Sequence, residues 1–562
     1  MICIQQKNQK LPKFHFVYEL IYLYSFPYHL DPYIMKKSLT GVLKRCNAIT
    51  LSATLLCLST ISYAQISGMH DPAKAINAVY TDVNPIISCE DLTKVSIPNA
   101  VIESAVADPK GFCLVTVVVN HPPANDHVKV WIALPTKNWN GRFYGTGGGG
   151  FVGGLTISLR EPVSEGFAAG ATNAGHEVFN ASFALDADNH HLNWQEIRDF
   201  AYLGIHDMTL VGKRLVQAFY GKPARYSYFA GGSNGGRQAL TESQRFPEDY
   251  DGILSLCPAI NWSYILISDL WPQAVMNDAK NLISKAKFDA VNKAMIETCD
   301  GLDGVKDGVI NDPLHCTWDP KTLVGTTVGE SLFSVADADV VRRIWEGPRA
   351  HDGKFLWHGM PRSSDLTAQA GTTGTPLKNA PNSLFTDWTK YFLTTDLKWD
   401  VSLMNCDAFE LLCNQSVEQY GAVFYAENTN LAPFRDHGGK LLIMHGLSDQ
   451  LINPQGTIEY FKEVEKQMGG DKATSKFVRL YLVPGVNHGF VGAGAGPVGE
   501  MDALISWVEK GKIPGVINAE LRDMSGKLIR TRPLFPYPQI ARYKGTGNTD
   551  EAANFVKSLP DK

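Results

Sequence analysis

Apolar residues along this chain gather in short runs, and most of these runs end in a loop that contains glycine. Such runs are typical of buried strands. They predict strands at residues 128–134, 142–144, 167–171, 226–230, 252–256, 440–445 and 479–483. Between several of them, apolar residues recur every three or four positions, which predicts helices over 202–220 and 501–510. Strands that alternate with helices favour an α/β fold with a mostly parallel sheet.

The alternation lapses over residues 258–430, which are loop-rich and aromatic, and resumes with the strand pattern KLLIMHG at 440–446. The economical interpretation is one α/β domain that follows residues 1–64, is formed by 65–257 and 431–562, and carries 258–430 as a large insertion. A separate second domain is the alternative. The candidate chemistry described below, however, needs residues from both sides of the insertion.

The N-terminal region has the pattern of a targeting signal. Residues 35–64 combine a basic beginning, an apolar stretch and small residues before Gln65, which predicts a secretory signal cleaved after Ala64. The apolar stretch is shorter than the ~20 residues that span a bilayer, which disfavours a membrane anchor. Because residues 1–34 lie upstream of a complete signal, we expect Met35 to be the start. The mature chain is expected to be periplasmic or secreted and to contain no membrane span.

Composition narrows the class of partner. The chain is 44% hydrophobic and 19% charged, which is an ordinary balance for a globular protein. Its net charge of -5 and the lack of long lysine or arginine runs leave no basic pattern for binding nucleic acid or an anionic membrane. A small or neutral partner is therefore expected.

Export also changes how the cysteines are interpreted, because an oxidising compartment permits disulfides. Three of the ten cysteines lie within residues 1–64, and the odd number that remains leaves at least one free thiol. Proximity in sequence suggests the pairs Cys89 with Cys113, Cys299 with Cys316, and Cys406 with Cys413, leaving Cys257 as a buried, inert thiol. No CxxC pair is present, which disfavours a zinc ribbon or a thioredoxin-type site.

The sequence FAGGSNGGR at 229–237 places Ser233 between a predicted strand and a predicted helix. Its Gly231-x-Ser233-x-Gly235 spacing is that of a nucleophile elbow, a sharp turn that needs small neighbours and holds a serine hydroxyl at a helix N-terminus. A plain glycine-rich turn is the alternative. A serine hydroxyl is a weak nucleophile without a base, so the elbow interpretation requires an acid and a histidine later in the chain.

Both residues are found after later predicted strands. Asp449 lies in the loop that follows the strand at 440–445, and His488 lies in the sequence PGVNHGF after the strand at 479–483. The order serine, aspartate, histidine is that of α/β-hydrolases, in which the aspartate orients the histidine and the histidine moves the proton. Taken alone, Asp449 could be a turn or N-cap residue and His488 a solvated loop histidine.

An acyl-transfer enzyme also needs backbone N–H groups that stabilise an oxyanion. The residue after the nucleophile, Asn234, is expected to supply one of them. The glycine run GTGGGGFVGG at 145–154 follows an earlier predicted strand and is expected to supply the other. A flexible linker is the alternative for this run. It does not fit the G-x-G-x-x-G pattern with an acidic ribose partner, so a dinucleotide site is disfavoured.

The insertion contains DGLDGVKDGV at 300–309, in which carboxylates recur at short spacing between glycines, with a further aspartate at 312. Carboxylate and carbonyl oxygens of this kind suit a hard cation such as Ca²⁺, although the spacing does not match an EF-hand. Composition alone leaves a metal site and plain Asx turns equally open.

Together these residues resemble the tannase and feruloyl esterase family. The resemblance extends from about residue 89 to 555. It rests on WNGRF at 139–143, SYFAGGSNGGR at 227–237, QRFPEDYDGI at 244–253, CDGLDGVKDGV at 299–309, FRDHGGK at 434–440, VPGVNH at 483–488 and RPLFPYPQIARY at 532–543.

The resemblance implies an α/β-hydrolase core in which the insertion forms a lid. It implies a catalytic triad of Ser233, Asp449 and His488, with an oxyanion hole from Gly148 and Asn234. It also favours Ca²⁺ over Asx turns, and Cys299 with Cys316 would close that loop. The implied calcium ligands are the side chains of Asp300, Asp303 and Asp307 and the carbonyls of Val305 and Val309.

The chain departs from the family pattern in three places. The family has cysteines just before the nucleophile and just after the histidine, joined in a disulfide, and here these positions are Gly232 and Gly489. The family's T-D-x-G-H is TNAGH at 172–176. The region 385–407 diverges from the terephthalate-monoester hydrolase of the family and offers no counterpart of its carboxylate-binding arginine.

The predicted function is therefore an exported serine esterase that cleaves esters of aromatic acids of the feruloyl or galloyl kind. Aromatic residues of the lid are candidates for the acyl pocket, with a core role as the alternative: Trp388, Tyr391, Phe392 and Phe424. The alternatives for the whole protein are a terephthalate-monoester hydrolase, a serine peptidase or a catalytically silent binding protein with a hydrolase fold. The presence of all three triad residues disfavours the silent protein.

Overall fold

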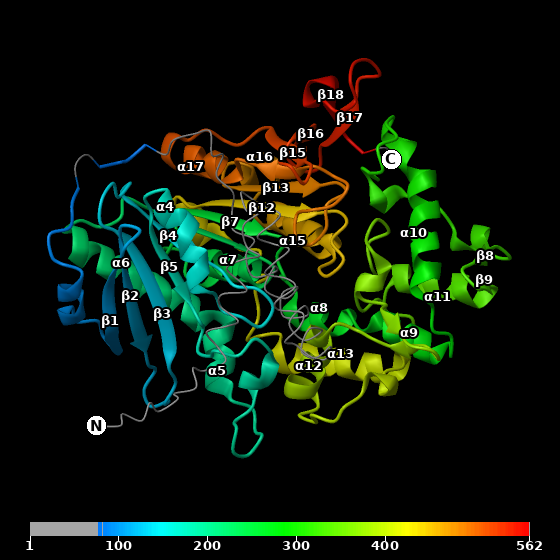
Figure 1. Ribbon diagram of the computed structural model, residues 1–562, viewed down its shortest axis with the longest axis horizontal. Helices are drawn as coiled ribbons and strands as arrows, with labels where there is room; N and C mark the ends of the chain where they lie inside the picture. The colour runs from blue at the N-terminus through cyan, green and yellow to red at the C-terminus, as the bar shows by residue number, and fades with distance from the viewer. Residues whose placement is uncertain (1–76, 81–82, 561–562) are drawn as a thin grey trace, which may run out of the picture. The chain divides into compact units, whose positions relative to one another are not determined.

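A nine-stranded sheet forms the centre of the protein, which is described by a computed structural model over residues 77–80 and 83–560 (Figure 1). The predicted signal at 35–64 lies outside the described residues. The strand order is β1-β2-β3-β5-β4-β6-β7-β12-β13. The strands are β1 Ala100–Asp108, β2 Phe112–Val119, β3 Val128–Pro135, β4 Arg142–Thr146, β5 Ala168–Thr172, β6 Tyr226–Gly232, β7 Gly252–Leu256, β12 Lys440–Gly446 and β13 Val478–Val483.

The sheet is mixed. Strands β1, β2, β3 and β5 pair antiparallel, and from β5 onward every neighbouring pair is parallel. All seven predicted strands are present, and the prediction of an α/β-hydrolase core is confirmed. The strand prediction missed β1 and β2. Most residues of β1 are half-buried or exposed, so that strand lacks a continuous apolar run.

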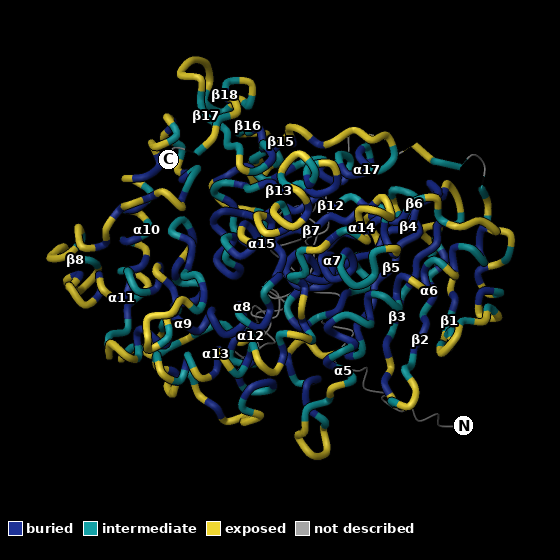
Figure 2. The backbone as a smooth tube through the Cα atoms, turned by 180° about the vertical axis from the view of Figure 1, so that it is seen from behind, coloured by how far each residue is buried: buried dark blue, intermediate teal, exposed yellow. Residues whose placement is uncertain are grey.

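Helices cover both faces of the sheet. The helices α6 (Gly204–Tyr220), α7 (Asn234–Arg245) and α15 (Pro454–Gln467) share one apolar cluster with the sheet, and α17 (Glu500–Lys510) belongs to another. Figure 2 shows the buried strands between these helices. Burial on both faces explains why the parallel strands are apolar throughout. The remaining helices outside the insertion are α4 Arg160–Ser164, α5 Trp194–Arg198, α14 Ala432–His437 and α16 Asp471–Thr474.

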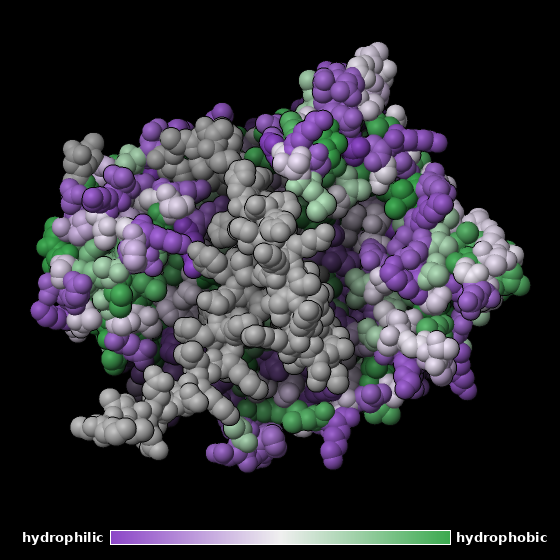
Figure 3. Space-filling view, viewed as in Figure 1, coloured by the Kyte–Doolittle hydropathy of each residue, from purple (hydrophilic) through white to green (hydrophobic). Residues whose placement is uncertain are grey.

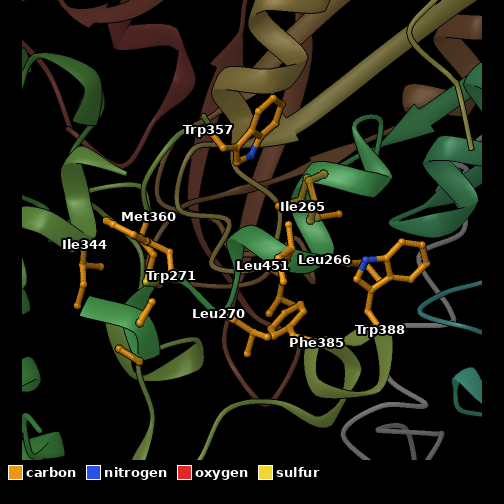
Figure 4. Packing of buried hydrophobic residues seen from close by; sticks show 14 of the residues in the cluster. Ile265, Leu266, Leu270, Trp271, Ile344, Trp357, Met360, Phe385, Trp388 and Leu451 are labelled. Atoms are coloured by element: carbon orange, nitrogen blue, oxygen red, sulfur yellow. The ribbon is translucent and has the colours of Figure 1, made fainter. Parts of the chain in front are cut away.

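The insertion at 258–430 contributes no strand to the central sheet, and most of its regular secondary structure is helical. Its apolar core also contains Leu451 and Ile452, which come from the loop after β12. Figure 4 shows Leu451 among the apolar side chains of the insertion. The insertion therefore packs directly on the loop that carries Asp449. Its elements are α8 Trp262–Ser268, α9 Trp271–Asp278, α10 Lys285–Cys299, α11 Val335–Glu346, α12 Ser383–Asp387, α13 Cys406–Tyr420 and the two-stranded pairs β8 Thr327–Val328 with β9 Ser331–Leu332 and β10 Thr372–Thr373 with β11 Lys378–Asn379.

Two of the suggested disulfides are confirmed, Cys89–Cys113 and Cys299–Cys316. The third suggestion was wrong, because Cys406 and Cys413 are free. Both lie on α13, where a separation of seven residues corresponds to about 10 Å along the axis, too far for a disulfide. Cys257 is buried and free, as predicted.

The C-terminal segment forms two small antiparallel sheets. These are β14 (Gly496–Val498), β15 (Ile517–Arg522) and β16 (Leu528–Leu534), and the pair β17 (Ile540–Tyr543) and β18 (Phe555–Ser558). On the face shown in Figure 3, hydrophilic and hydrophobic side chains are interspersed over the described surface. None of the helices in the described part of the chain is long and apolar enough to cross a bilayer.

Candidate active site

Ser233 sits on a strained turn between β6 and α7. Its φ of 62° and ψ of -123° are a backbone conformation that residues with a side chain rarely adopt. Two backbone hydrogen bonds join the turn to β7 and the loop after it: Ser233 N donates to Leu256 O at 3.0 Å, and Ser233 O accepts from Ala259 N at 3.1 Å. The turn also requires a glycine at 231, where a Cβ would lie 2.7 Å from Gly235 C. This is the geometry of a nucleophile elbow.

The later aspartate and histidine meet near the carboxyl ends of β12 and β13. Asp449 Oδ2 accepts a hydrogen bond from His488 Nδ1 at 2.8 Å, and both side chains are buried. Asp449 Oδ1 accepts the N–H groups of Leu451 and Ile452, each at 2.9 Å. Asp449 is thus held in the orientation that aligns an imidazole through its Nδ1. The other partner, His445, places Nε2 at 3.1 Å from Asp449 Oδ2 and was not singled out in the sequence.

Opposing effects set the charges of this pair. Burial alone would raise the pKa of Asp449, but the charges and hydrogen bonds of His488 and His445 outweigh burial and hold that pKa below its usual range. Burial would lower the pKa of His488, but the negative charge of Asp449 outweighs it and raises the pKa well above the ordinary value. The carboxylate therefore stabilises an imidazolium, which is what a histidine becomes when it takes a proton from serine.

The glycine-rich run after β4 packs directly on the elbow helix. Gly235 N donates to Gly148 O at 2.9 Å, and a Cβ at 148 would lie 2.0 Å from Val152 O. The N–H of Gly148 donates to Gln238 Oε1 at 2.9 Å, while Gln238 Nε2 donates to Gly153 O at 3.2 Å. A substrate oxygen that binds the Gly148 N–H would therefore have to share this donor with Gln238 Oε1 or displace Gln238 Oε1 from it. The role of Gln238 was not expected, since only the fold brings α7 against this loop.

Cys257 lies beside the aspartate and histidine. Its Sγ donates to His488 O at 3.5 Å and lies within 4.8 Å of a ring nitrogen of His488 and a carboxylate oxygen of Asp449. Burial raises the pKa of this thiol, so it stays protonated. A small neutral side chain thus contacts the loop that carries His488.

The aromatic residues of the lid are mostly core residues. Trp388, Phe392 and Phe424 are each at most 2% exposed, and only Tyr391 is half-buried. The Phe392 ring stacks on Phe151 of the glycine-rich run, with centroids 6.1 Å apart. The core role thus describes three of the four candidates, and their packing connects the lid to the loop beside Ser233.

The aspartate-rich segment of the lid forms a compact loop. Asp300 Oδ1 accepts the N–H groups of Asp307 and Val309, and Asp303 Oδ1 accepts that of Val305. Asp307 Oδ2 lies 3.2 Å from Arg530 Nη1 and 2.5 Å from Arg532 Nη2, both on β16. A cavity of about 330 Å³ opens beside this loop, and no triad residue lines it.

A mixed sheet of this order, with a serine elbow followed by an aspartate–histidine pair, defines an α/β-hydrolase. Comparison with known proteins narrows this class. The family described as tannase and feruloyl esterase matches residues 113–558. The chain therefore belongs to the tannase and feruloyl esterase family, and it is a carboxylic ester hydrolase.

Individual relatives agree with this assignment. A probable feruloyl esterase of Arthroderma benhamiae is 40% identical, over 79% of this chain and 85% of its own length. The mono(2-hydroxyethyl) terephthalate hydrolase of Piscinibacter sakaiensis is 31% identical, over 77% of this chain and 82% of its own. The crystal structure of feruloyl esterase B from Aspergillus oryzae shares the fold, with a TM-score of 0.74 and 24% identity over 84% of this chain and 100% of that one.

Proposed function

We propose that this protein is an exported serine esterase that cleaves esters of aromatic acids of the feruloyl or galloyl kind through an acyl-enzyme. The observation that carries the proposal is the buried hydrogen bond between Asp449 and His488, on the loops after β12 and β13, in a chain whose Ser233 occupies a strained elbow. The names of the relatives support aromatic acid esters as the substrate class.

In the proposed mechanism Ser233 Oγ attacks the ester carbonyl carbon while His488 takes the hydroxyl proton. The backbone N–H groups of Asn234 and Gly148 hold the oxyanion of the tetrahedral intermediate. His488 then gives the proton to the departing alcohol, which leaves an acyl group on Ser233. Water then attacks the carbonyl carbon of the acyl-enzyme while His488 takes a proton from it. The bond to Ser233 Oγ breaks, His488 returns the proton to this oxygen, and the aromatic acid leaves; Asp449 stabilises the imidazolium in both halves.

Labelling with a fluorophosphonate probe tests the serine mechanism. We expect the intact protein to be labelled and Ser233→Ala to be unlabelled with an unchanged melting temperature. Thr209→Ala, which changes a hydroxyl on α6, serves as a control and should still be labelled. A protein that is not labelled at all, or a Ser233→Ala variant that is, would contradict the mechanism.

The substrate class is tested by parallel hydrolysis of methyl ferulate, methyl gallate, a terephthalate monoester and a small peptide ester. We expect methyl ferulate or methyl gallate to give the highest kcat/KM. A preference for the terephthalate monoester would instead favour the second substrate class of the family. Indifference to all the aromatic esters would refute the aromatic-acid proposal.

Export is supported by the signal pattern at 35–64 and by the two disulfides, which persist in oxidising compartments. Fractionation of expressing cells, followed by N-terminal sequencing, tests it. We expect the mature protein outside the cytoplasm and beginning at Gln65. Full-length protein retained in the cytoplasm would overturn this proposal.

We also propose a structural Ca²⁺ in the loop at 300–309. In the sequence, three aspartates at short spacing and the carbonyls between them are oxygen donors of the kind that a hard cation takes. In the structure Asp300 and Asp303 accept backbone N–H groups of the same loop, so an ion would have to share or replace these hydrogen bonds. The side chains of Asp300, Asp303 and Asp307 and the carbonyls of Val305 and Val309 would hold the ion. Asp307 would share its carboxylate with Arg530 and Arg532. Such an ion would tie this loop of the lid together and take no part in the reaction.

Metal analysis of protein purified without chelator tests this site, together with melting in EDTA. We expect one bound calcium per chain and a melting temperature several degrees lower in EDTA. The variant Asp303→Asn should lose the metal, whereas the control Asp339→Asn, on the exposed side of α11, should keep it. If no calcium is bound and the melting temperature is unchanged in EDTA, the loop consists of ordinary Asx turns and the metal proposal is wrong.

A further inference from the structure

Arg237, in the first turns of the elbow helix α7, is a fully enclosed cation with 0% of its surface exposed. Its Nε and Nη2 both donate to Asn234 Oδ1, at 2.9 and 2.7 Å. Nη1 donates to Ala201 O at 2.6 Å, and Nη2 also reaches Phe200 O at 3.3 Å. Three aromatic rings surround the guanidinium carbon at 5.5, 5.2 and 5.4 Å, those of Phe200, Trp262 and Phe424.

All of these acceptors are neutral. Among the residues that the structure describes, no carboxylate oxygen lies within 4.0 Å of the Arg237 guanidinium. The equally buried Arg142 is different, since its guanidinium forms a bidentate pair with Glu509 at 2.6 and 2.7 Å. An enclosed charge without a counter-charge is destabilising, and a neutral side chain of similar volume would avoid that cost.

The position of Arg237 in the fold suggests which anion would balance its positive charge. Arg237 N donates to Ser233 O at 3.0 Å, so the backbone of Arg237 lies one helical turn after the nucleophile. The guanidinium group donates two hydrogen bonds to the side chain of Asn234, and the backbone N–H of Asn234 is the expected oxyanion donor. Burial lowers the pKa of Arg237 to about 9, which still leaves the side chain charged at neutral pH.

We propose that Arg237 is a positioning residue of the oxyanion hole. Through the paired hydrogen bonds to Asn234 Oδ1 it fixes the first turn of α7, and its uncompensated charge favours the negative oxygen that develops on the substrate. The anion missing from the resting protein is then the tetrahedral intermediate itself. The inference rests on the proposed serine esterase mechanism and deepens it by assigning a residue that does not contact the substrate.

This role predicts a selective loss of transition-state stabilisation. Removing a direct oxyanion donor costs about 10²–10³-fold in kcat, and an indirect residue should cost less, about 10–100-fold. Substrate in the ground state carries no such charge, so KM should change little. A boronic acid, which becomes a tetrahedral anion when the serine oxygen bonds to boron, should lose affinity by the same factor as kcat falls.

The experiment compares intact protein with Arg237→Met, Arg237→Lys and Asn234→Ala, using hydrolysis of p-nitrophenyl acetate and inhibition by phenylboronic acid. We expect Arg237→Met to lose about 10–100-fold in kcat and in boronic acid affinity, with KM within about threefold. Arg237→Lys, which keeps the charge but not the fork, should recover part of both losses. The control Arg142→Met removes a buried arginine far along the chain, and it should lose stability but neither kcat nor boronic acid affinity.

Several outcomes would overturn the inference. One is an Arg237→Met variant with unchanged kcat and boronic acid affinity, and another is a loss that appears in KM alone. If Arg237→Met does not fold, Asn234→Ala decides. It removes the side-chain oxygen that accepts from Arg237 together with the long 3.3 Å hydrogen bond from Asn234 Nδ2 to Val152 O, and it keeps the backbone N–H. We expect it to lower kcat about tenfold, and an unchanged kcat would refute the positioning role. If the intact protein cleaves p-nitrophenyl acetate but none of the esters of aromatic acids, the proposed substrate class fails while the inference about Arg237 stands. If it cleaves neither, the esterase mechanism itself fails.

Discussion

The three residues of the proposed triad are each held by a different local device. Ser233 lies on a strained turn with a positive φ, and the close backbone approach there requires glycine at positions 231 and 235. Asp449 is held by two backbone N–H groups on Oδ1 and by histidines on Oδ2. His488 is held by Asp449, and the Cys257 thiol contacts its carbonyl oxygen. Residues 232 and 489, next to the nucleophile and the histidine, are both glycine, so no disulfide joins the elbow to the histidine loop at these positions.

The pH dependence of kcat/KM should report this arrangement. His488 accepts a proton only when it is neutral, and Asp449 raises its pKa, so activity should rise with pH through a midpoint clearly above 6.5. In Asp449→Asn the negative charge is gone and burial acts alone, so the midpoint should fall to 6.5 or below. The plateau should also fall about 10⁴-fold, because the imidazole is no longer oriented. A midpoint that does not move in this variant would show that another group controls the rate.

Among the elements, the glycine-rich run and α7 are joined by hydrogen bonds and close backbone contacts beside the nucleophile. Gly235 N donates to Gly148 O, and Gln238 accepts the Gly148 N–H and donates to Gly153. Neither contact would survive a side chain on the loop, since the backbones approach too closely. The loop is therefore part of the site by geometry, whichever of its N–H groups faces the substrate.

The variant Gly148→Ala tests that unit. Its Cβ would lie 2.0 Å from Val152 O and 2.4 Å from Gly153 O, so the loop must move and kcat should fall at least about 100-fold. The control Gly489→Ala is next to His488, but its Cβ would meet nothing closer than 3.6 Å and should leave kcat within about twofold. Comparing steady-state kinetics of the two variants checks the expectation. Equal effects would mean that the glycine loop has no special role.

The molecule as a whole is assembled from chain segments that are distant in sequence. The lid shares its core with Leu451 and Ile452 beside Asp449, and the C-terminal strand β16 reaches the lid through Arg530 and Arg532. Arg142 at the start of β4 pairs with Glu509 on α17 in the same manner. These contacts make the α/β core and the lid one compact unit.

The Arg142–Glu509 pair should therefore support stability without touching catalysis. Arg142→Met leaves the Glu509 carboxylate almost fully buried without its cation, which should cost about 3–5 kcal/mol in the free energy of unfolding. The double variant Arg142→Met with Glu509→Leu removes both charges and should regain most of that loss. Denaturant unfolding measures the energies, and kcat should be unchanged in both variants. A double variant as unstable as the single one would contradict the explanation.

Much of this architecture could be predicted from the sequence because its signals are local. The seven predicted strands are apolar runs, and the elbow is a pattern of five residues whose small neighbours are required by one turn. The order of Ser233, Asp449 and His488 followed from the loops after later strands. The edge strand β1 was missed because an exposed edge carries a weak apolar signal.

Contacts between distant segments had no such signal. Gln238 and Arg237 look like ordinary polar helix positions until α7 is packed against the glycine loop and the aromatic residues of the lid. Cys406 and Cys413 looked like a disulfide until both were placed on one helix, too far apart to bond. Residue type and spacing thus predicted the family and the core strands, and they indicated the residues of the candidate triad. The partners of buried polar groups were settled by packing, because which donor meets which acceptor depends on how the elements come together in space.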